Sequence, residues 1–408
     1  MIITANFDID GKDKNTVQNG SSLYIVKRLK MGQGKSSSLP SWARIIIFLT
    51  LLYIFFVAIG LMGGAFKLLG QDTAKYLLSA TSNPFTGLMI GILATSLVQS
   101  SSFTTSMTVG LVSGGVISIE GAVPIIMGAN IGTSVTNLIV SLGHIGHNKE
   151  FERAFAGATI HDLFNFISVG VLLPVEIMTG ALSKAGTFLA YSFAGSSSLS
   201  FDSPLKIIVK PAVKFIKSLI IDTMNFDPKT AGIIMIALSF TLLFFALIMI
   251  VKNMKAMMLD RLEVAIDRLF GANPIFAILV GMVITAIIQS SSITTSLLIP
   301  LIGAGAMSLE AAFPITLGAN IGTTITALLA SLAGDVNGLA IAFVHLVFNL
   351  GGTILIYPIK AIREIPIKAA RKLANVAVND KKFAVAFVVG IFYILPLTAF
   401  GISQLFNW

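Results

Sequence analysis

The chain carries QSSSFTTS at positions 99–106 and repeats it, with one difference, as QSSSITTS at positions 289–296. Two further motifs recur at the same offset of 190 residues: Asn-Pro at 83–84 and 273–274, and GANIGT at 128–133 and 318–323. Chance does not produce so many matches at one spacing. The sequence therefore contains two copies of one structural unit.

Each QSSS motif interrupts a long apolar stretch, 85–116 in the first copy and 272–303 in the second. As one straight helix each stretch would measure nearly 50 Å, because a helix rises about 1.5 Å per residue. The hydrocarbon core of a bilayer is only about 30 Å thick. Divided at the polar run, each arm has about 14 residues and is too short to cross. We therefore predict two re-entrant helical hairpins with QSSS at their tips.

Each copy then reads as a helix, a hairpin, a broken helix and a final helix, which gives an odd number of crossings. An odd number inverts the second copy relative to the first, as in many secondary transporters. The predicted fold class is an all-α polytopic membrane protein with two inverted-topology repeats. Its predicted segments are a disordered cytoplasmic tail (1–41), the first repeat (42–182), a linker with an amphipathic helix (183–230), the second repeat (231–359), and a basic loop with a final transmembrane helix (360–408).

Composition supports a membrane protein and excludes several other classes. Of 408 residues, 55% are hydrophobic and 12% are charged, about half the charge content of a soluble domain. The absence of Cys excludes thiol chemistry. The net charge of +9 comes from short loops between apolar runs, which favours cytoplasmic loops over nucleic-acid binding. We expect a multi-pass protein of the cell membrane with a cytoplasmic N-terminus, although lysines in the predicted outer linker 183–230 count against this orientation.

The hairpin tips are the first candidate binding site. Hydroxyls and unpaired backbone amides at membrane depth are tolerated only inside protein or beside a wet cavity. Helix N-termini at the tips would also favour an anion. The alternative is that Ser and Thr only pack helices together. Because the tips are duplicated, we favour ligand binding by Gln99, Ser100, Ser101, Ser102, Gln289, Ser290, Ser291 and Ser292.

The GANIGT motifs are the second candidate. Asn130 and Asn320 would lie about 11 residues into their helices, roughly 16 Å deep. Local unwinding at the glycines would free carbonyl oxygens, which together with amide and hydroxyl oxygens suit a hard cation such as Na⁺. The alternative is a close helix crossing lined by glycine.

The third candidate is His161-Asp162-x-x-Asn165. An acid deep inside a membrane helix is a functional candidate by default, and its expected partner is a cation. The second copy has Leu346 in place of Asp162, so the copies differ chemically. His161 and His345 are either hydrogen-bonded core residues or direct ligands. No Lys or Arg lies in the middle of a predicted span, so bound Na⁺ would have to neutralise an anion at the tips.

These motifs closely resemble those of the type II sodium-dependent phosphate cotransporter family. The resemblance rests on the paired QSSS and GANIGT motifs and on RAFAGATIHD at 153–162, and it covers about 42–359. Because the linker has no Cys, the chain looks like a bacterial-type member. The resemblance implies that phosphate binds at the two tips. With the GANIGT argument, the predicted sodium-binding set is Asn130, Thr133, Asp162, Asn165, Gln289, Ser290, Asn320, Thr323 and Thr326.

The resulting hypothesis is a symporter that imports HPO₄²⁻ with sodium by alternating access. An acid at the Asp162 position accompanies electrogenic transport in the resembled family. Inorganic phosphate, sodium ions and the lipid bilayer are the expected partners, Na⁺ is the coupling ion, and no cofactor is expected. The alternatives are a transporter of another oxyanion such as sulfate or arsenate, and an ion channel. A membrane enzyme is disfavoured because no Ser lies in a nucleophile-elbow sequence. The oligomeric state is left open.

Overall fold

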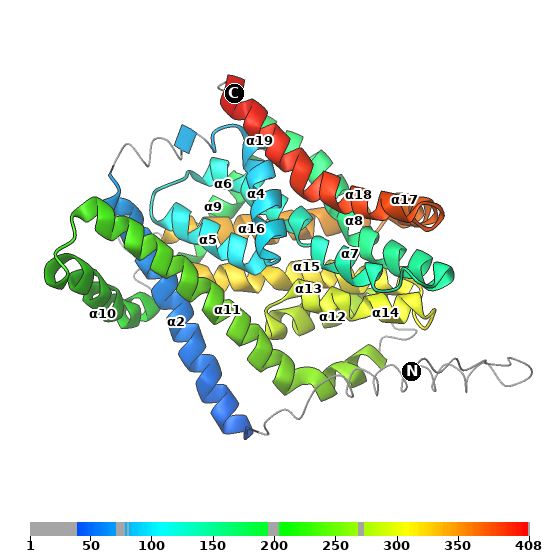
Figure 1. Ribbon diagram of the computed structural model, residues 1–408, viewed down its shortest axis with the longest axis horizontal. Helices are drawn as coiled ribbons and strands as arrows, with labels where there is room; N and C mark the ends of the chain where they lie inside the picture. The colour runs from blue at the N-terminus through cyan, green and yellow to red at the C-terminus, as the bar shows by residue number, and fades with distance from the viewer. Residues whose placement is uncertain (1–38, 71–77, 80, 195–203, 268–272, 407–408) are drawn as a thin grey trace, which may run out of the picture.

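The computed structural model describes residues 39–70, 78–79, 81–194, 204–267 and 273–406 (Figure 1). The described residues form helices and connecting turns without any β-strand, which confirms the predicted all-α class. Almost all of the predicted tail 1–41 lies outside the described residues.

Seven segments within the described part of the chain are long and apolar enough to cross a membrane. This number equals three spans in each repeat and one final span, and it confirms a polytopic membrane protein. The segments are α2 (Ser41–Leu68), α6 with α7 (Ile119–Gly132 and Val135–Leu142), α8 (Asn148–Thr179), α11 (Pro228–Asp267), α15 (Leu309–Ser331), α16 (Val336–Ile356), and α18 through η2 into α19 (Lys381–Val389, Gly390–Ile394 and Leu395–Phe406).

The QSSS motifs each connect two short helices. In the first repeat they are α4 (Pro84–Val98) and α5 (Ser101–Ser113), and in the second they are α12 (Pro274–Ile288) and α13 (Ser291–Ser296), followed by α14 (Leu298–Gly303). The first arm of each pair ends because its glutamine adopts a left-handed backbone, with φ of 55° at Gln99 and 62° at Gln289. The next residue is a serine N-cap, which accepts a hydrogen bond from the backbone N–H three residues later.

A threonine pair closes each hairpin below its tip. Thr95 Oγ1 donates to Thr104 Oγ1 at 2.9 Å, and Thr285 Oγ1 donates to Thr294 Oγ1 at 2.8 Å. These pairs are related by the offset of 190 residues. Equivalent threonines of the two sequence repeats therefore form equivalent hydrogen bonds.

The GANIGT glycines form close helix crossings. The hairpin arms α4 and α12 pack on α6 and α15 respectively. A methyl group at Gly128 would overlap the carbonyl oxygen of Leu88, and one at Gly318 would overlap that of Ile278. The helix α15 runs through its motif without interruption, so the predicted break in the second repeat is wrong. The first repeat does break, at 133–134 between α6 and α7. In the second repeat, the motif glycines therefore permit close helix packing and do not unwind the helix.

Helices also occupy the segments predicted as linker and loop. The linker contains most of α9 (Ala181–Ala194), which packs on α16, and α10 (Pro204–Ser218), which packs on α2. Pro211 lies inside α10 without interrupting it. The predicted basic loop is wrong in its first part, because residues 360–379 form the helix α17 (Lys360–Asn379).

The sequence of α17 explains why it is helical. Its buried residues Pro366, Ile367, Ala370, Ala374 and Ala377 recur at helical spacing and face α8. The charged residues occupy the other face. In Figure 1, α2 and α11 run together on the left of the bundle, and α17 lies on the right beside α8.

Candidate functional site

The two QSSS tips meet inside the bundle. The Ser102 hydroxyl, in the first turn of α5, donates to the backbone carbonyl of Gln289 at 3.1 Å. Thr326 on α15 donates to Gln289 Oε1 at 2.9 Å, and its hydroxyl lies 3.4 Å from that of Ser102. All three residues are buried. Three segments that are far apart in the sequence therefore converge on Gln289.

Several tip hydroxyls have no hydrogen-bond partner among the described residues. Ser101, Ser291 and Ser292 are at most 8% exposed, and their hydroxyls make no hydrogen bond to any described residue. Ser100 and Ser290 instead cap the following helices. Gln99 is exposed whereas Gln289 is buried, so the two tips are not equivalent. The Ser101 hydroxyl and the first backbone N–H groups of α5 can donate hydrogen bonds to an anion, as can the hydroxyls of Ser291 and Ser292 at the other tip.

A second polar group joins the repeats through α6, α8 and α15. Asn320 Nδ2 donates to Asn165 Oδ1 at 2.9 Å, and Asn165 Nδ2 donates to the carbonyl of Asn130 at 3.0 Å. His161 Nε2 contacts Asn320 Oδ1, while Ser134 Oγ lies 2.9 Å from His161 Nδ1. An amide oxygen only accepts, so Nε2 carries a proton and donates to Asn320. His161 is therefore a hydrogen-bonded core histidine.

Asp162 lies next to this network and has no comparable partner. It is completely buried, and neither carboxylate oxygen accepts a hydrogen bond of good geometry from the described residues. An ionised carboxylate without a partner is costly to bury, and a cation would relieve that cost. Asp162 is the strongest single candidate for a cation ligand.

The threonines of the GANIGT motifs are buried but already donate within their own helices. Thr133 donates to the carbonyl of Ala129 at 2.9 Å, and Thr323 donates to that of Ala319 at 3.0 Å. Each oxygen keeps lone pairs that a cation could use. Thr323 is spaced by three residues from both Asn320 and Thr326, so it lies between the amide network and the tips. The Asn130 side chain donates back to the carbonyl of Ile126 at 2.9 Å.

The second repeat lacks a counterpart of the amide network. His345 and Asn349 correspond to His161 and Asn165, and both are buried. Their side-chain nitrogen and oxygen atoms make no hydrogen bond to the described residues. Equivalent residues are therefore paired in one repeat and unpaired in the other.

Asn137 on α7 is a residue of this site that was not predicted from the sequence. Its Oδ1 accepts hydrogen bonds from Thr295 at 2.9 Å and from Ser296 at 3.0 Å, and so attaches the second hairpin to the first repeat. The second repeat has Ala327 at the equivalent position. The sequence feature that could have indicated Asn137 is its polar amide within the otherwise mostly apolar run 135–142. Ser134, the partner of His161, was also missed.

Buried charge in the described part of the chain is sparse. No Lys or Arg is buried there, and the buried carboxylates are Asp162 and Glu176. Glu176 accepts from the backbone N–H of Leu182 at 2.7 Å and from that of Ser183 at 3.3 Å, so its charge is stabilised.

Comparisons with known proteins give one consistent result. Residues 54–190 and 242–369 match the family described as Na⁺/Pi-cotransporter. The chain is 37% identical to sodium-dependent phosphate transport protein 2B of Homo sapiens over 88% of its own length, and 36% identical to sodium-dependent phosphate transport protein 2A of Rattus norvegicus over 88%. It spans 65% of the former protein and 68% of the latter. No solved structure matches the chain significantly.

Proposed function

The chain belongs to the Na⁺/Pi-cotransporter family, and from this premise we propose that it is a sodium-coupled symporter that imports HPO₄²⁻ and is not an enzyme. Convergence of the two QSSS tips on Gln289, with unpaired hydroxyls beside them, is the observation that carries the proposal. The family relationship makes phosphate the favoured anion.

Phosphate binds at the tips in this proposal. Ser101, Ser291 and Ser292 supply hydroxyl donors, and the first turn of α5 adds backbone N–H groups. Gln99, Ser100, Ser102, Gln289 and Ser290 complete the set. These groups are neutral, and burying a divalent anion among neutral donors costs many kcal/mol.

Sodium supplies the missing positive charge. Asp162 is the charged ligand, and neutral oxygens of Asn130, Thr133, Asn165, Gln289, Ser290, Asn320, Thr323 and Thr326 provide the rest of the candidate set. Because the tips bind phosphate well only when sodium neutralises it, anion movement is coupled to sodium movement. Sodium is thus a coupling ion, and no further cofactor is required.

The two repeats are related by inverted topology and operate by alternating access in this proposal. The protein lies in the cell membrane with a cytoplasmic N-terminus, and the beginning of α2, the end of α11 and the helix α17 share that side. Transport is electrogenic because Asp162 adds a sodium ion beyond those that neutralise phosphate.

Uptake of labelled phosphate into proteoliposomes tests the proposal. We expect saturable uptake with an inward sodium gradient, little uptake with potassium in its place, and faster uptake when the interior is negative. Equal uptake in potassium would refute sodium coupling. Labelled uptake that is unaffected by excess unlabelled phosphate, or displaced as well by sulfate, would refute phosphate selectivity. Flux that never saturates would indicate a channel.

A further inference from the structure

A basic cavity lies away from the QSSS tips, where α8 and α15 begin. It has a volume of about 840 Å³ and lies between the first turns of α8, the turn that follows α14, and the last turns of α17. Two candidate membrane spans start there, so the cavity lies at the ends of these spans rather than along them. We call it the interfacial pocket.

Basic residues outnumber acidic ones in the lining of the interfacial pocket. Its charged lining residues are Lys149, Arg153, Arg371 and Lys372, against a single acid, Glu152. Among the described residues, neither Lys149 nor Lys372 forms an ion pair. A lysine in the first turn of a helix also opposes the helix dipole, so Lys149 does not serve the stability of α8. These two charges are available to a ligand.

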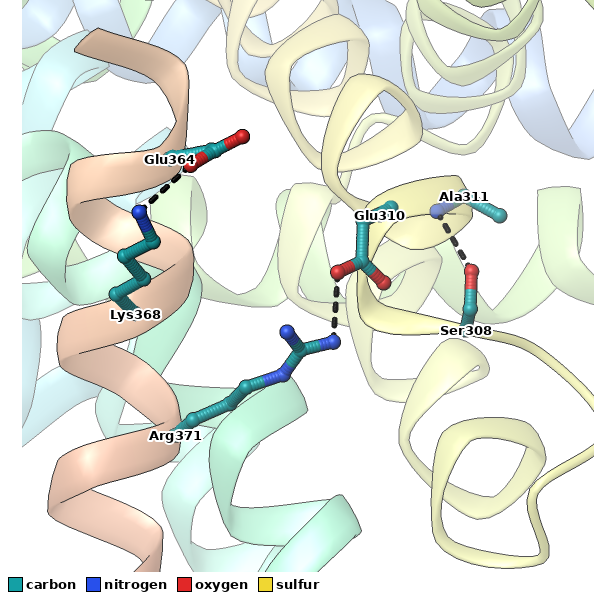
Figure 2. Close-up of polar contacts among 6 residues, drawn as sticks. All are labelled: Ser308, Glu310, Ala311, Glu364, Lys368 and Arg371. Carbon is teal, nitrogen blue, oxygen red and sulfur yellow. Dashed lines mark hydrogen bonds and ion pairs between the residues drawn. The ribbon is translucent and has the colours of Figure 1, made fainter. Parts of the chain in front are cut away.

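The two arginines are held in place by the protein. Arg153 Nε donates to the carbonyl of Gly303 at 2.8 Å, and its guanidinium lies against Gly305, which has a φ of +75°. Arg371 reaches from α17 to Glu310 at the start of α15, with Nη2 2.6 Å from Oε1 (Figure 2). In contrast, Glu364 and Lys368 pair with each other on α17 (Figure 2).

We propose that the interfacial pocket binds a phosphate-bearing anion, either the headgroup of an anionic phospholipid or inorganic phosphate. Guanidinium and ammonium groups from two helices line this one cavity, and such groups recognise phosphate oxygens by charge-assisted hydrogen bonds. The proposal does not depend on transport at the tips.

A general surplus of basic residues on one side of the membrane would also place positive charge here. The two explanations differ in geometry. Lys381 and Lys382 begin α18 close in sequence to α17, and neither lines the interfacial pocket. A double variant at these positions removes the same charge from outside the pocket.

The experiment compares the full chain in detergent with Lys149→Gln/Lys372→Gln and with the control Lys381→Gln/Lys382→Gln. Each protein is titrated with dioctanoyl phosphatidylglycerol, with dioctanoyl phosphatidylcholine, and with potassium phosphate in sodium-free buffer. Binding is read from the thermal unfolding midpoint. Both variants remove exposed lysines, and unchanged midpoints without ligand verify that they fold.

We expect half-maximal stabilisation by the binding anion to require a concentration about thirtyfold higher in the pocket variant, since each basic residue near an anionic headgroup contributes about fivefold. The control should titrate like the unmodified chain. A response to phosphatidylglycerol identifies a lipid, and one to potassium phosphate identifies the free ion. Equal titrations of all three proteins would overturn the proposal. It would also be overturned if neither anion raised the unfolding midpoint of the unmodified chain more than phosphatidylcholine does. Phosphate uptake assayed separately tests the proposed transport function.

Discussion

Replacing Asp162 with glycine should separate phosphate movement from charge movement. Two sodium ions neutralise HPO₄²⁻, so an inward current requires one more. Asp162 is completely buried without a hydrogen-bond partner among the described residues, which makes it the candidate ligand of that additional ion. The other buried carboxylate described, Glu176, is already stabilised by backbone N–H groups. Asp162→Gly should therefore retain sodium-dependent uptake but carry no net charge.

The size of the effect follows from the charge that is lost. Moving one elementary charge through 100 mV is worth about 2.3 kcal/mol. This energy corresponds to about a fiftyfold difference in the limiting accumulation of phosphate. A membrane potential should therefore raise accumulation by the unmodified chain about fiftyfold and leave the Asp162→Gly variant unaffected.

The assay records current and labelled phosphate uptake on the same proteoliposome preparation, with potential set by a potassium gradient. Glu120→Gln is the matched control, because it removes one exposed acid from the first turn of α6. It should keep the charge moved per phosphate. If Asp162→Gly also keeps that ratio, the assignment of Asp162 is refuted.

Three further predictions concern the tips, the glycine crossings and Asn137. Ser101→Ala or Ser291→Ala should raise the KM for phosphate about tenfold or more, because a hydrogen bond to a charged group contributes about 1.5–3 kcal/mol. Unchanged kinetics in both variants would show that the tip serines only pack helices together. Gly318→Ala should destabilise the protein by about 1–3 kcal/mol because its methyl group meets the carbonyl of Ile278, whereas Gly170→Ala, with open space around it, should be neutral or stabilising; equal unfolding midpoints would contradict this reading. Asn137→Ala should slow transport more than Thr136→Ala, because only Asn137 holds the second hairpin through Thr295 and Ser296; uptake assays compare the two.

Much of the fold could be predicted because repetition and length are read directly from sequence. The QSSS offset and the short arms located α4, α5, α12 and α13 and their tips. The continuity of α15 could not be predicted, because glycines that permit unwinding and glycines that permit close packing look alike in sequence. The helix α17 was missed because its many charges concealed the helical spacing of Ile367, Ala370 and Ala374.

The residue types of the candidate site can be read from the sequence, but the hydrogen bonds between their side chains cannot. The repeats suggest equivalent tips and equivalent His and Asn residues. The structure instead buries Gln289 and exposes Gln99, and it pairs His161 but not His345. A single chain can place its two repeats in different conformations, and only the three-dimensional arrangement shows which residues are paired. The proposed ligand assignments stay predictions.

The glycine crossings determine which parts of the molecule can separate. Main chain rests on main chain between α4 and α6 and between α12 and α15, so each hairpin is fastened along its length to a long neighbour. At the tips, by contrast, the Ser102 hydroxyl donates to the carbonyl of Gln289 in the other hairpin, and Asn137 on α7 accepts from Thr295 and Ser296. Close-packed interfaces shift as rigid pieces rather than deform. In the proposed transport cycle we therefore expect each hairpin to move together with its neighbouring helix as one rigid unit, and the bonds at Gln289 and Asn137 to be the ones that break.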